Sequence, residues 1–104
     1  MRYIIYTSEA HENLHEIFLY TADKWGIEQA KNYHNKFDDV FGSLALNPNI
    51  GHRHDYLLVD YFVYPVGSHL VIYRFTNSEL IIIAIVHMVM DVKNRLIKMI
   101  KSTK

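Results

Sequence analysis

Residues 80–87 read Leu-Ile-Ile-Ile-Ala-Ile-Val-His, the longest run of the chain without a polar residue before its last position. Eight residues rich in β-branched side chains are typical of a strand and few for a helix. A strand that is apolar at every position has both faces covered. We therefore predict a central strand, joined through the polar residues 76–79 to a second strand over residues 70–75 in an antiparallel hairpin.

Length and composition predict one ordinary globular domain. The chain has 104 residues, of which 50% are hydrophobic and 21% are charged, so it can build one core without disulfides. We expect a single domain over residues 1–104. The chain has no cysteine, which excludes disulfides, cysteine zinc sites and a thiol nucleophile, and suits a reducing compartment.

No segment predicts export or insertion into a membrane. The first eight residues turn polar too early for a signal sequence, and the longest apolar run is far shorter than a membrane span. We therefore expect a cytoplasmic protein. Eleven basic and eleven acidic residues cancel, so independent binding to nucleic acid is not expected. Their distribution is uneven, because residues 8–47 are mainly acidic and residues 92–104 hold five bases and no acid.

Two amphipathic helices are predicted between a first strand, residues 3–7, and the turn at residues 47–48. Ser8 can cap the first helix, whose apolar positions recur at helical spacing as far as Trp25. Gly26 is expected to end this helix as an αL cap, and the second helix follows at once over residues 27–46. Two long helices joined by one glycine form an antiparallel hairpin.

The remaining segments complete a sheet and a short terminal helix. Residues 56–64 are predicted to be extended, and Asp91 can cap a short basic helix with one apolar face. The fold class is therefore α+β. We expect an N-terminal strand, an antiparallel two-helix hairpin packed on a mainly antiparallel sheet, and a short C-terminal helix.

The helical hairpin can cover only one face of this sheet. Simple alternation along the central strand places Leu80, Ile82, Ala84 and Val86 on one face and Ile81, Ile83 and Ile85 on the other. Monomers rarely leave more than a few hundred Å² of apolar surface bare. The second face is therefore expected to bind a partner segment. The expected contact residues are Tyr61, Tyr73, Ile82 and Val86.

Five short motifs follow one another along nearly the whole chain. They are Lys24-Trp-Gly-Ile-Glu-Gln-Ala30, Phe37-Asp-Asp-Val-Phe41, Leu44-Ala-Leu-Asn-Pro-Asn-Ile-Gly51, Tyr64-Pro-Val-Gly-Ser-His-Leu-Val-Ile-Tyr-Arg74, and His87 with Met90-Asp-Val92. Together and in this order they resemble the ParE branch of the RelE/ParE toxins of type II toxin–antitoxin modules. The resemblance implies the same architecture of a strand, two helices and a sheet.

The resemblance also implies partners and an activity. A cognate antitoxin, of the ribbon-helix-helix type, is expected to wrap the toxin with its C-terminal segment and to form a hetero-oligomer with it. The implied activity is inhibition of DNA gyrase by binding, without a catalytic reaction or a cofactor. The basic C-terminal end is the expected contact with gyrase, because the predicted helices are acidic. The expected contact residues are His87, Lys93, Arg95, Lys98 and Lys101.

A group of imidazoles leaves open a second hypothesis, a messenger-RNA endonuclease of the RelE type. Imidazole titrates near neutrality and can act as general acid or base. The candidate catalytic residues are His52, His54, Asp55, His69 and His87, with Tyr73 beside them. The segment Met88-Val89-Met90 supplies no Arg or Lys to stabilise the charge of a transition state, so binding to gyrase is preferred.

Three sites differ from the usual ParE pattern and leave open a third hypothesis, an inactive protein that keeps the toxin fold as a binding partner. Phe62 and Ala84 stand where ParE-like chains usually carry arginine. Met88-Val89 stands where these chains carry a charged pair. Lost charges of this kind would affect activity more than folding.

Two further features are interpreted as structural. The segment His11-Glu-Asn-Leu-His15 fits the zinc-binding pattern H-E-x-x-H. Glu12 points away from the predicted apolar stripe and no third ligand is evident, so we interpret this segment as a solvated helix flank and expect no metal. Trp25 lies on the apolar stripe, and we expect it to pack in the core or in the helical hairpin.

Overall fold

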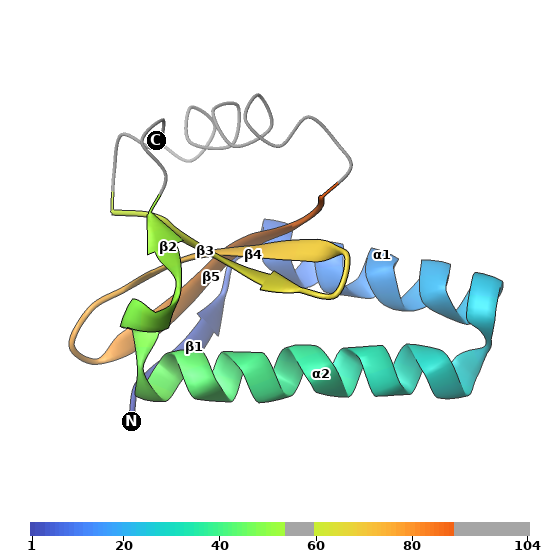
Figure 1. Cartoon of the computed structure of the whole chain (residues 1–104), viewed down its shortest axis with the longest axis horizontal. Coiled ribbons are helices and arrows are strands. Elements are labelled where there is room, and N and C mark those ends of the chain that lie inside the picture. The colour runs from blue at the N-terminus through green and yellow to red at the C-terminus, as the bar shows by residue number, and fades with distance from the viewer. Residues whose placement is uncertain (54–59, 89–104) are drawn as a thin grey trace.

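The computed structural model describes residues 1–53 and 60–88 (Figure 1). Its sheet has five strands in the order β1-β5-β4-β3-β2. β1 pairs in parallel with β5, and every other neighbouring pair is antiparallel. The strands are β1 (Tyr3–Tyr6), β2 (His52–Arg53), β3 (Phe62–Val66), β4 (His69–Phe75) and β5 (Glu79–His87). The predicted α+β class, the central strand and its hairpin partner are confirmed, while the predicted C-terminal helix lies outside the described residues.

The two helices have the predicted bounds, α1 (Ser8–Trp25) and α2 (Ile27–Leu46), and a 3-10 turn, η1 (Pro48–Ile50), follows them. Both predicted caps need correction. Thr7 is the N-cap of α1, because its Oγ1 accepts a hydrogen bond from the Ala10 amide at 3.0 Å. Gly26 ends the helix with φ 94° and ψ 164°, which is a conformation that favours glycine but is not the αL cap.

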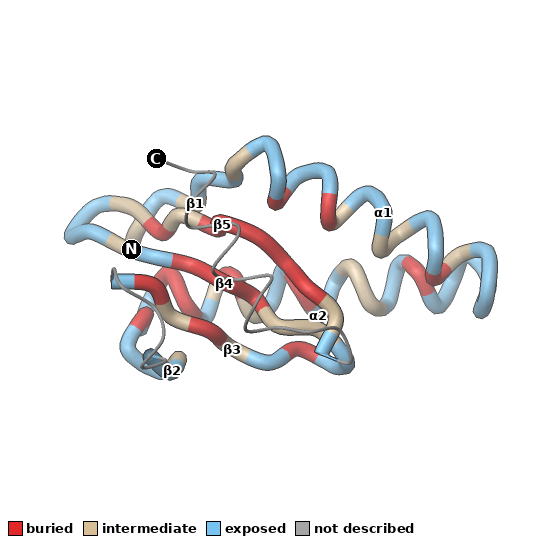
Figure 2. Tube along the Cα trace, turned by 90° about the horizontal axis from the view of Figure 1, so that it is seen from above, coloured by how far each residue is buried: buried red, intermediate tan, exposed pale blue. Residues whose placement is uncertain are grey.

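Helices α1 and α2 cover one face of the sheet, and the core lies between these layers (Figures 1 and 2). Burial is concentrated in β4 and β5, whereas the outer sides of both helices are exposed (Figure 2). We call the core between helices and strands the helix-side cluster. Its buried members are Ala10, Phe37, Phe41, Leu44, Ala45, Val66, Val71, Tyr73, Leu80, Ile82 and Ile85.

A β-bulge in β5 corrects the predicted division of its side chains between the two faces. Ile72 of β4 lies opposite Ala84, but the next residue, Tyr73, lies opposite Ile82, so Ile83 is an extra residue. Beyond the bulge the alternation is shifted by one position. Ile82 and Ile85 therefore share the helix-side cluster, and the prediction that Ile82, Ala84 and Val86 lie on one face is wrong.

The second face of the sheet carries an outer cluster of buried residues. Its members are Tyr61, Val63, Ile72, Ile83, Ala84 and Val86. The most exposed of them, Tyr61, retains 9% of its accessible surface, and Val86 retains 2%. The expectation that this face displays a bare apolar surface is therefore not met. Burial of these side chains within one chain removes the energetic reason for requiring a partner there.

The edge of β5 beyond β1 is completed by polar side chains from the start of α1. Thr7 Oγ1 donates a hydrogen bond to the Ile83 carbonyl at 2.7 Å, and the Ile85 amide donates to Asn13 Oδ1 at 2.9 Å. Asn13 is 6% exposed, so this bond satisfies a strand amide that would otherwise be buried without a partner. These bonds hold α1 beside the end of β5.

The predicted extended segment, residues 56–64, is only partly observed. Residues 54–59 lie outside the described part of the chain, and β3 begins at Phe62 and continues through Pro65 to Val66. β2 pairs only with Phe62 and Val63. Among the described residues Pro65 therefore has a strand on one side alone, which is the setting in which a sheet tolerates a residue without an amide hydrogen.

Candidate functional site

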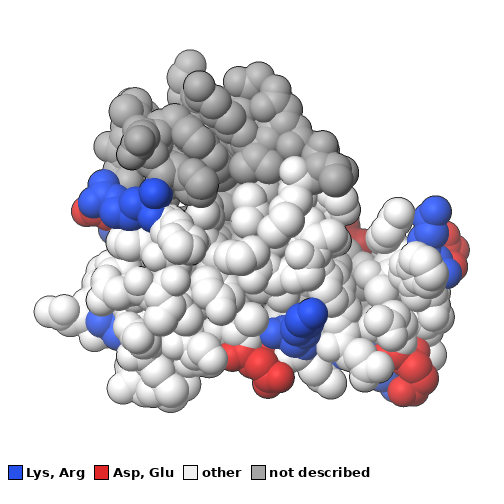
Figure 3. Space-filling view, in the orientation of Figure 1, with Lys and Arg blue, Asp and Glu red and all other residues white. Residues whose placement is uncertain are grey.

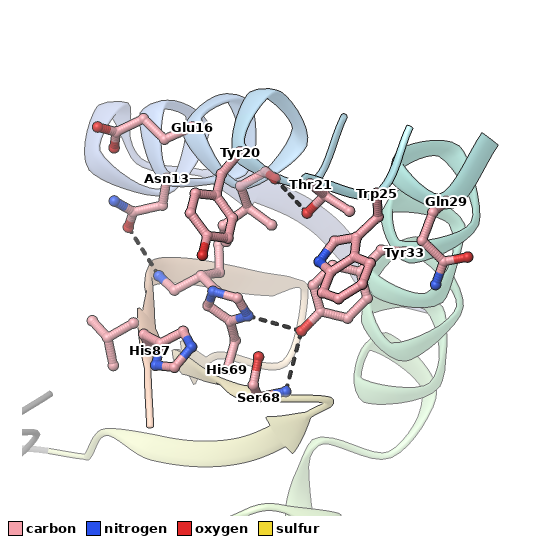
Figure 4. A pocket seen from close by; sticks show the side chains of 13 residues that line it. Asn13, Glu16, Tyr20, Thr21, Trp25, Gln29, Tyr33, Ser68, His69 and His87 are labelled. Carbon is pink, nitrogen blue, oxygen red and sulfur yellow. Dashed lines mark hydrogen bonds between the residues drawn. The ribbon is translucent and has the colours of Figure 1, made fainter. Parts of the chain in front are cut away.

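An open groove of about 960 Å³ lies between the helical hairpin and the adjoining ends of β4 and β5. The hairpin projects past the sheet on the side of the β3–β4 turn (Figure 1), which leaves room for the groove. Side chains from both helices and both strands line it (Figure 4). The polar and aromatic members are Asn13, Glu16, Tyr20, Thr21, Trp25, Gln29, Tyr33, Ser68, His69 and His87.

Tyr33 connects α2 to the turn between β3 and β4 (Figure 4). Its hydroxyl lies 2.8 Å from His69 Nδ1 and 3.0 Å from the Val66 carbonyl oxygen, and it accepts a hydrogen bond from the Ser68 amide at 3.3 Å. Gly67 in this turn has φ 59°, and a Cβ there would lie 2.7 Å from Tyr33 Cε1. The turn therefore needs glycine for its conformation and for the close approach of the tyrosine ring.

His69 and His87 form a pair on the floor of the groove. They lie directly opposite each other in the β4–β5 ladder, and their ring centroids are 5.0 Å apart. Burial, with a smaller contribution from His87, lowers the pKa of His69 from 6.5 to about 4. At neutral pH the His69 ring is therefore uncharged.

This lowered pKa predicts a stability that depends on pH. The unfolded chain binds a proton at His69 below pH 6.5, whereas the folded chain does so only near pH 4. The free energy of unfolding should therefore fall as pH falls through this window, by about 1 kcal/mol because solvent screens a half-buried ring. Denaturant titrations at several pH values will measure this loss.

Asparagine is the matched control at this position, because its amide can replace Nδ1 as the partner of Tyr33 but does not titrate. His69→Asn should lose that part of the pH dependence which lies between pH 4 and 6.5. An identical pH profile for the variant and the parent chain would contradict the assignment to His69.

The charges of the groove argue against a phosphate ligand. Among its lining residues in the described part of the chain, Glu16 is the one formally charged side chain, and none is Lys or Arg. In the view of Figure 3, most of the described surface is uncharged, and opposite charges gather at the end of the hairpin. A ribonuclease must stabilise a negatively charged transition state. The described wall of the groove offers no cation for that purpose.

The structure assembles only part of the predicted catalytic group. His69 and His87 are neighbours, but His52 lies on β2, which β3 separates from β4. The Tyr73 hydroxyl donates to the Pro48 carbonyl at 2.5 Å inside the helix-side cluster, where it is 0% exposed. His54 and Asp55 lie outside the described residues. The predicted gyrase contacts Lys93, Arg95, Lys98 and Lys101 also lie there.

The predicted antitoxin contacts divide between the two clusters. Tyr73 and Ile82 are each 0% exposed and belong to the helix-side cluster. They offer no surface to a partner of the folded chain. Tyr61 and Val86 belong to the outer cluster, and Val86 also lines the groove. Tyr61 and Val86 keep exposed fractions of only 9% and 2%.

Two other interpretations can be compared with the structure. Trp25 is 72% exposed, so its predicted burial is wrong, and it lines the groove instead. His11, Glu12 and His15 are exposed on α1. Within residues 1–53 and 60–88, no three His, Asp or Glu side chains come close enough to hold a metal ion. No helix in those same residues is long and apolar enough to span a membrane.

Several groove residues were missed by the sequence analysis. Asn13 occupies a position on the apolar stripe of α1, and this misplaced amide was the available signal for its bond to β5. Tyr20 and Gln29 gave no signal, because both are exposed helix residues of ordinary type. Tyr33 gave no signal either, because its bond to His69 depends on a contact distant in sequence.

Comparison with known proteins identifies the family and the fold. Residues 4–92 match the model of the family described as the ParE toxin of the type II toxin–antitoxin system parDE. Toxin ParE1 of Mycobacterium tuberculosis is 33% identical over 96 residues, covering 91% of this chain and 97% of the relative. Toxin ParE1 of Caulobacter vibrioides is 30% identical over 87 residues, covering 84% and 90%.

Two solved structures share the fold. The chromosomal ParDE system of P. aeruginosa matches with a TM-score of 0.71 and 17% identity, over 84% of this chain and 96% of the other. The toxin–antitoxin complex RelBE2 of Mycobacterium tuberculosis matches with a TM-score of 0.55 and 18% identity, over 83% and 96%. The fold is therefore the one found in RelE/ParE-type toxins. From its sequence, the chain belongs to the ParE family of type II toxin–antitoxin toxins.

Proposed function

We propose that this toxin acts in the cytoplasm, as one domain over residues 1–104, by binding and inhibiting DNA gyrase without a catalytic step. A cognate antitoxin, of the ribbon-helix-helix type, neutralises it in a hetero-oligomer. The observation that carries this proposal is the match of residues 4–92 to the ParE family. The described wall of the groove, which lacks Lys and Arg, supports binding over cleavage of RNA.

Two assays on the purified toxin test this mechanism against the alternative. The toxin should inhibit supercoiling by purified gyrase and leave a messenger RNA intact during translation. The His69–His87 pair is the one observation that favours the ribonuclease of the RelE type. Cleaved messenger together with unaffected supercoiling would therefore reject gyrase as the target.

The inactive alternative has its own test. Alanine and phenylalanine supply no charge at the two positions where ParE-like chains usually carry arginine. Ala84 is fully buried in the outer cluster, and Phe62 packs against Tyr73 and Phe75. Expression of the toxin without its antitoxin should nevertheless arrest growth. Unimpaired growth at comparable protein levels would favour the inactive binding protein. A short upstream gene for a ribbon-helix-helix protein would support the proposed antitoxin type.

A further inference from the structure

We propose that the groove binds a basic, extended segment of a protein partner, whose Lys or Arg side chains lie over the rings of Tyr20 and Trp25 and beside the carboxylate of Glu16. The proposal concerns the chemistry of this partner segment and does not depend on gyrase being the target. It rests on the exposure of the two rings, on the charge of α1 and on the contacts of Lys24.

The aromatic wall of the groove is open to solvent. Trp25 is 72% exposed and Tyr20 is 62% exposed, although large aromatic side chains usually contribute most when they are buried. Both side chains extend from α1 toward the side of the groove that holds His69 (Figure 4). An exposed aromatic face attracts a cation through its quadrupole, and tryptophan does so most strongly.

The chain already shows one such attraction at this place. Lys24 Nζ lies 5.8 Å from the centroid of the Tyr20 ring, which is within the range of a cation–π contact. Lys24 itself does not line the groove. The Tyr20 ring is thus able to hold an ammonium group, and its side chain remains 62% exposed with Lys24 in place.

Charge complementarity selects a basic segment over an acidic one. Glu16 is the one charged residue among the described lining residues. α1 also carries Glu9, Glu12 and Asp23 against a single base, Lys24. Glu16 and Tyr20 are separated by four residues on this helix and therefore lie on the same side of it. Both residues line the groove, so this side of α1 presents a carboxylate and an aromatic ring to it.

Apolar side chains of the same segment would also find contacts in the groove. Ile17, Ile85 and Val86 line it together with the aromatic residues. A groove of about 960 Å³ is large enough for several side chains of an extended peptide. The expected partner segment therefore alternates basic and aliphatic residues.

The single tryptophan of the chain provides a direct test. Trp25 is the only tryptophan, so its fluorescence reports occupancy of the groove without a label. The probes are a short acetylated peptide that repeats Ser-Arg-Leu and matched peptides that repeat Ser-Glu-Leu or Ser-Gln-Leu. The arginine peptide should change the fluorescence in a saturable way and bind about tenfold more tightly than the glutamate peptide. This preference should weaken as salt is added.

Two variants of α1 separate the proposed site from general attraction to an acidic helix. Glu16→Gln should weaken the arginine peptide about threefold to fivefold, as expected for one exposed ion pair. Glu12→Gln removes the same charge from the same helix, but Glu12 does not line the groove, so it should weaken binding clearly less than Glu16→Gln. Tyr20→Leu keeps an apolar side chain and should weaken binding about threefold through loss of the ring.

Three results would overturn the proposal. These are the absence of a saturable change in Trp25 fluorescence, equal affinity for the arginine and glutamate peptides, and equal effects of Glu16→Gln and Glu12→Gln. Both glutamates are exposed, so the variants should fold, and their circular dichroism and thermal midpoints will verify this.

Discussion

Replacing Ile82 with lysine is expected to unfold the protein. Ile82 is 0% exposed in the helix-side cluster, where an ammonium group would find neither water nor a carboxylate. The cost of burying an unpaired charge together with the lost packing is on the order of 4 kcal/mol or more, which is a large part of the stability of a small domain. Circular dichroism and denaturant titration will measure the loss.

The neighbouring residue is the matched control for this substitution. Ile81 lies on the other face of β5, is only partly buried and packs at the margin of the outer cluster. Ile81→Lys can extend its ammonium group to water and should remain folded, with a clearly smaller loss of stability. A stable Ile82→Lys variant, or an unfolded Ile81→Lys variant beside it, would mean that the two faces are assigned incorrectly.

Reversing the charges of the C-terminal segment is expected to abolish inhibition of gyrase. The variant replaces Lys93, Arg95, Lys98 and Lys101 with glutamate. If these bases contact gyrase, as the sequence leads us to expect, reversal turns attraction into repulsion and should lower the potency about 100-fold or more. A supercoiling assay will measure the toxin concentration required for half inhibition, after circular dichroism has shown that the variant is folded.

Two bases of α2 offer a control for a double variant of the C-terminal segment, because both double variants change the net charge by the same amount. Lys31 and Lys36 are exposed, and neither lines the groove. The double variant Lys31→Glu, Lys36→Glu should keep most of its potency, whereas Lys98→Glu, Lys101→Glu should lose much of it. Unchanged inhibition by the fourfold variant would remove the C-terminal segment from the mechanism.

The sequence predicted the helices well because their signals are local. The apolar stripes, Gly26 and the turn at Asn47 and Pro48 lie within the segments that they define. The bounds of α1 and α2 were therefore predicted correctly. The predicted N-cap, Ser8, is one residue after the observed N-cap, Thr7. Both residue types can serve as N-caps, and only the bond between Thr7 and Ala10 distinguishes them.

The faces of β5 could not be predicted from its composition. A strand that is apolar at every position has no polar residue to mark which side is buried against the helices, so its pattern does not reveal a bulge. The extra residue at Ile83 was therefore invisible, and the assignments of Ile82 and Val86 to one face followed from that.

The groove could not be predicted because it depends on how far the helical hairpin extends beyond the sheet. The apolar stripe of α1 correctly predicted a helix as far as Trp25, but it does not indicate where the sheet beneath the helix ends. Trp25 lies beyond that end and is exposed. The bond between Tyr33 and His69 joins residues that are 36 positions apart, and no local pattern encodes such a contact.

The bulge also determines which residues form the floor of the groove. It works like a frameshift inside the strand. Before Ile83 the even-numbered side chains face the helices, and after it the odd-numbered side chains do. In an unshifted strand, His87 would point away from the helices and Val86 would take its place beside His69. Deletion of the single residue Ile83 would remove the bulge but leave Ala84 opposite Ile72 and His87 opposite His69, so the imidazole pair on the floor of the groove would be kept.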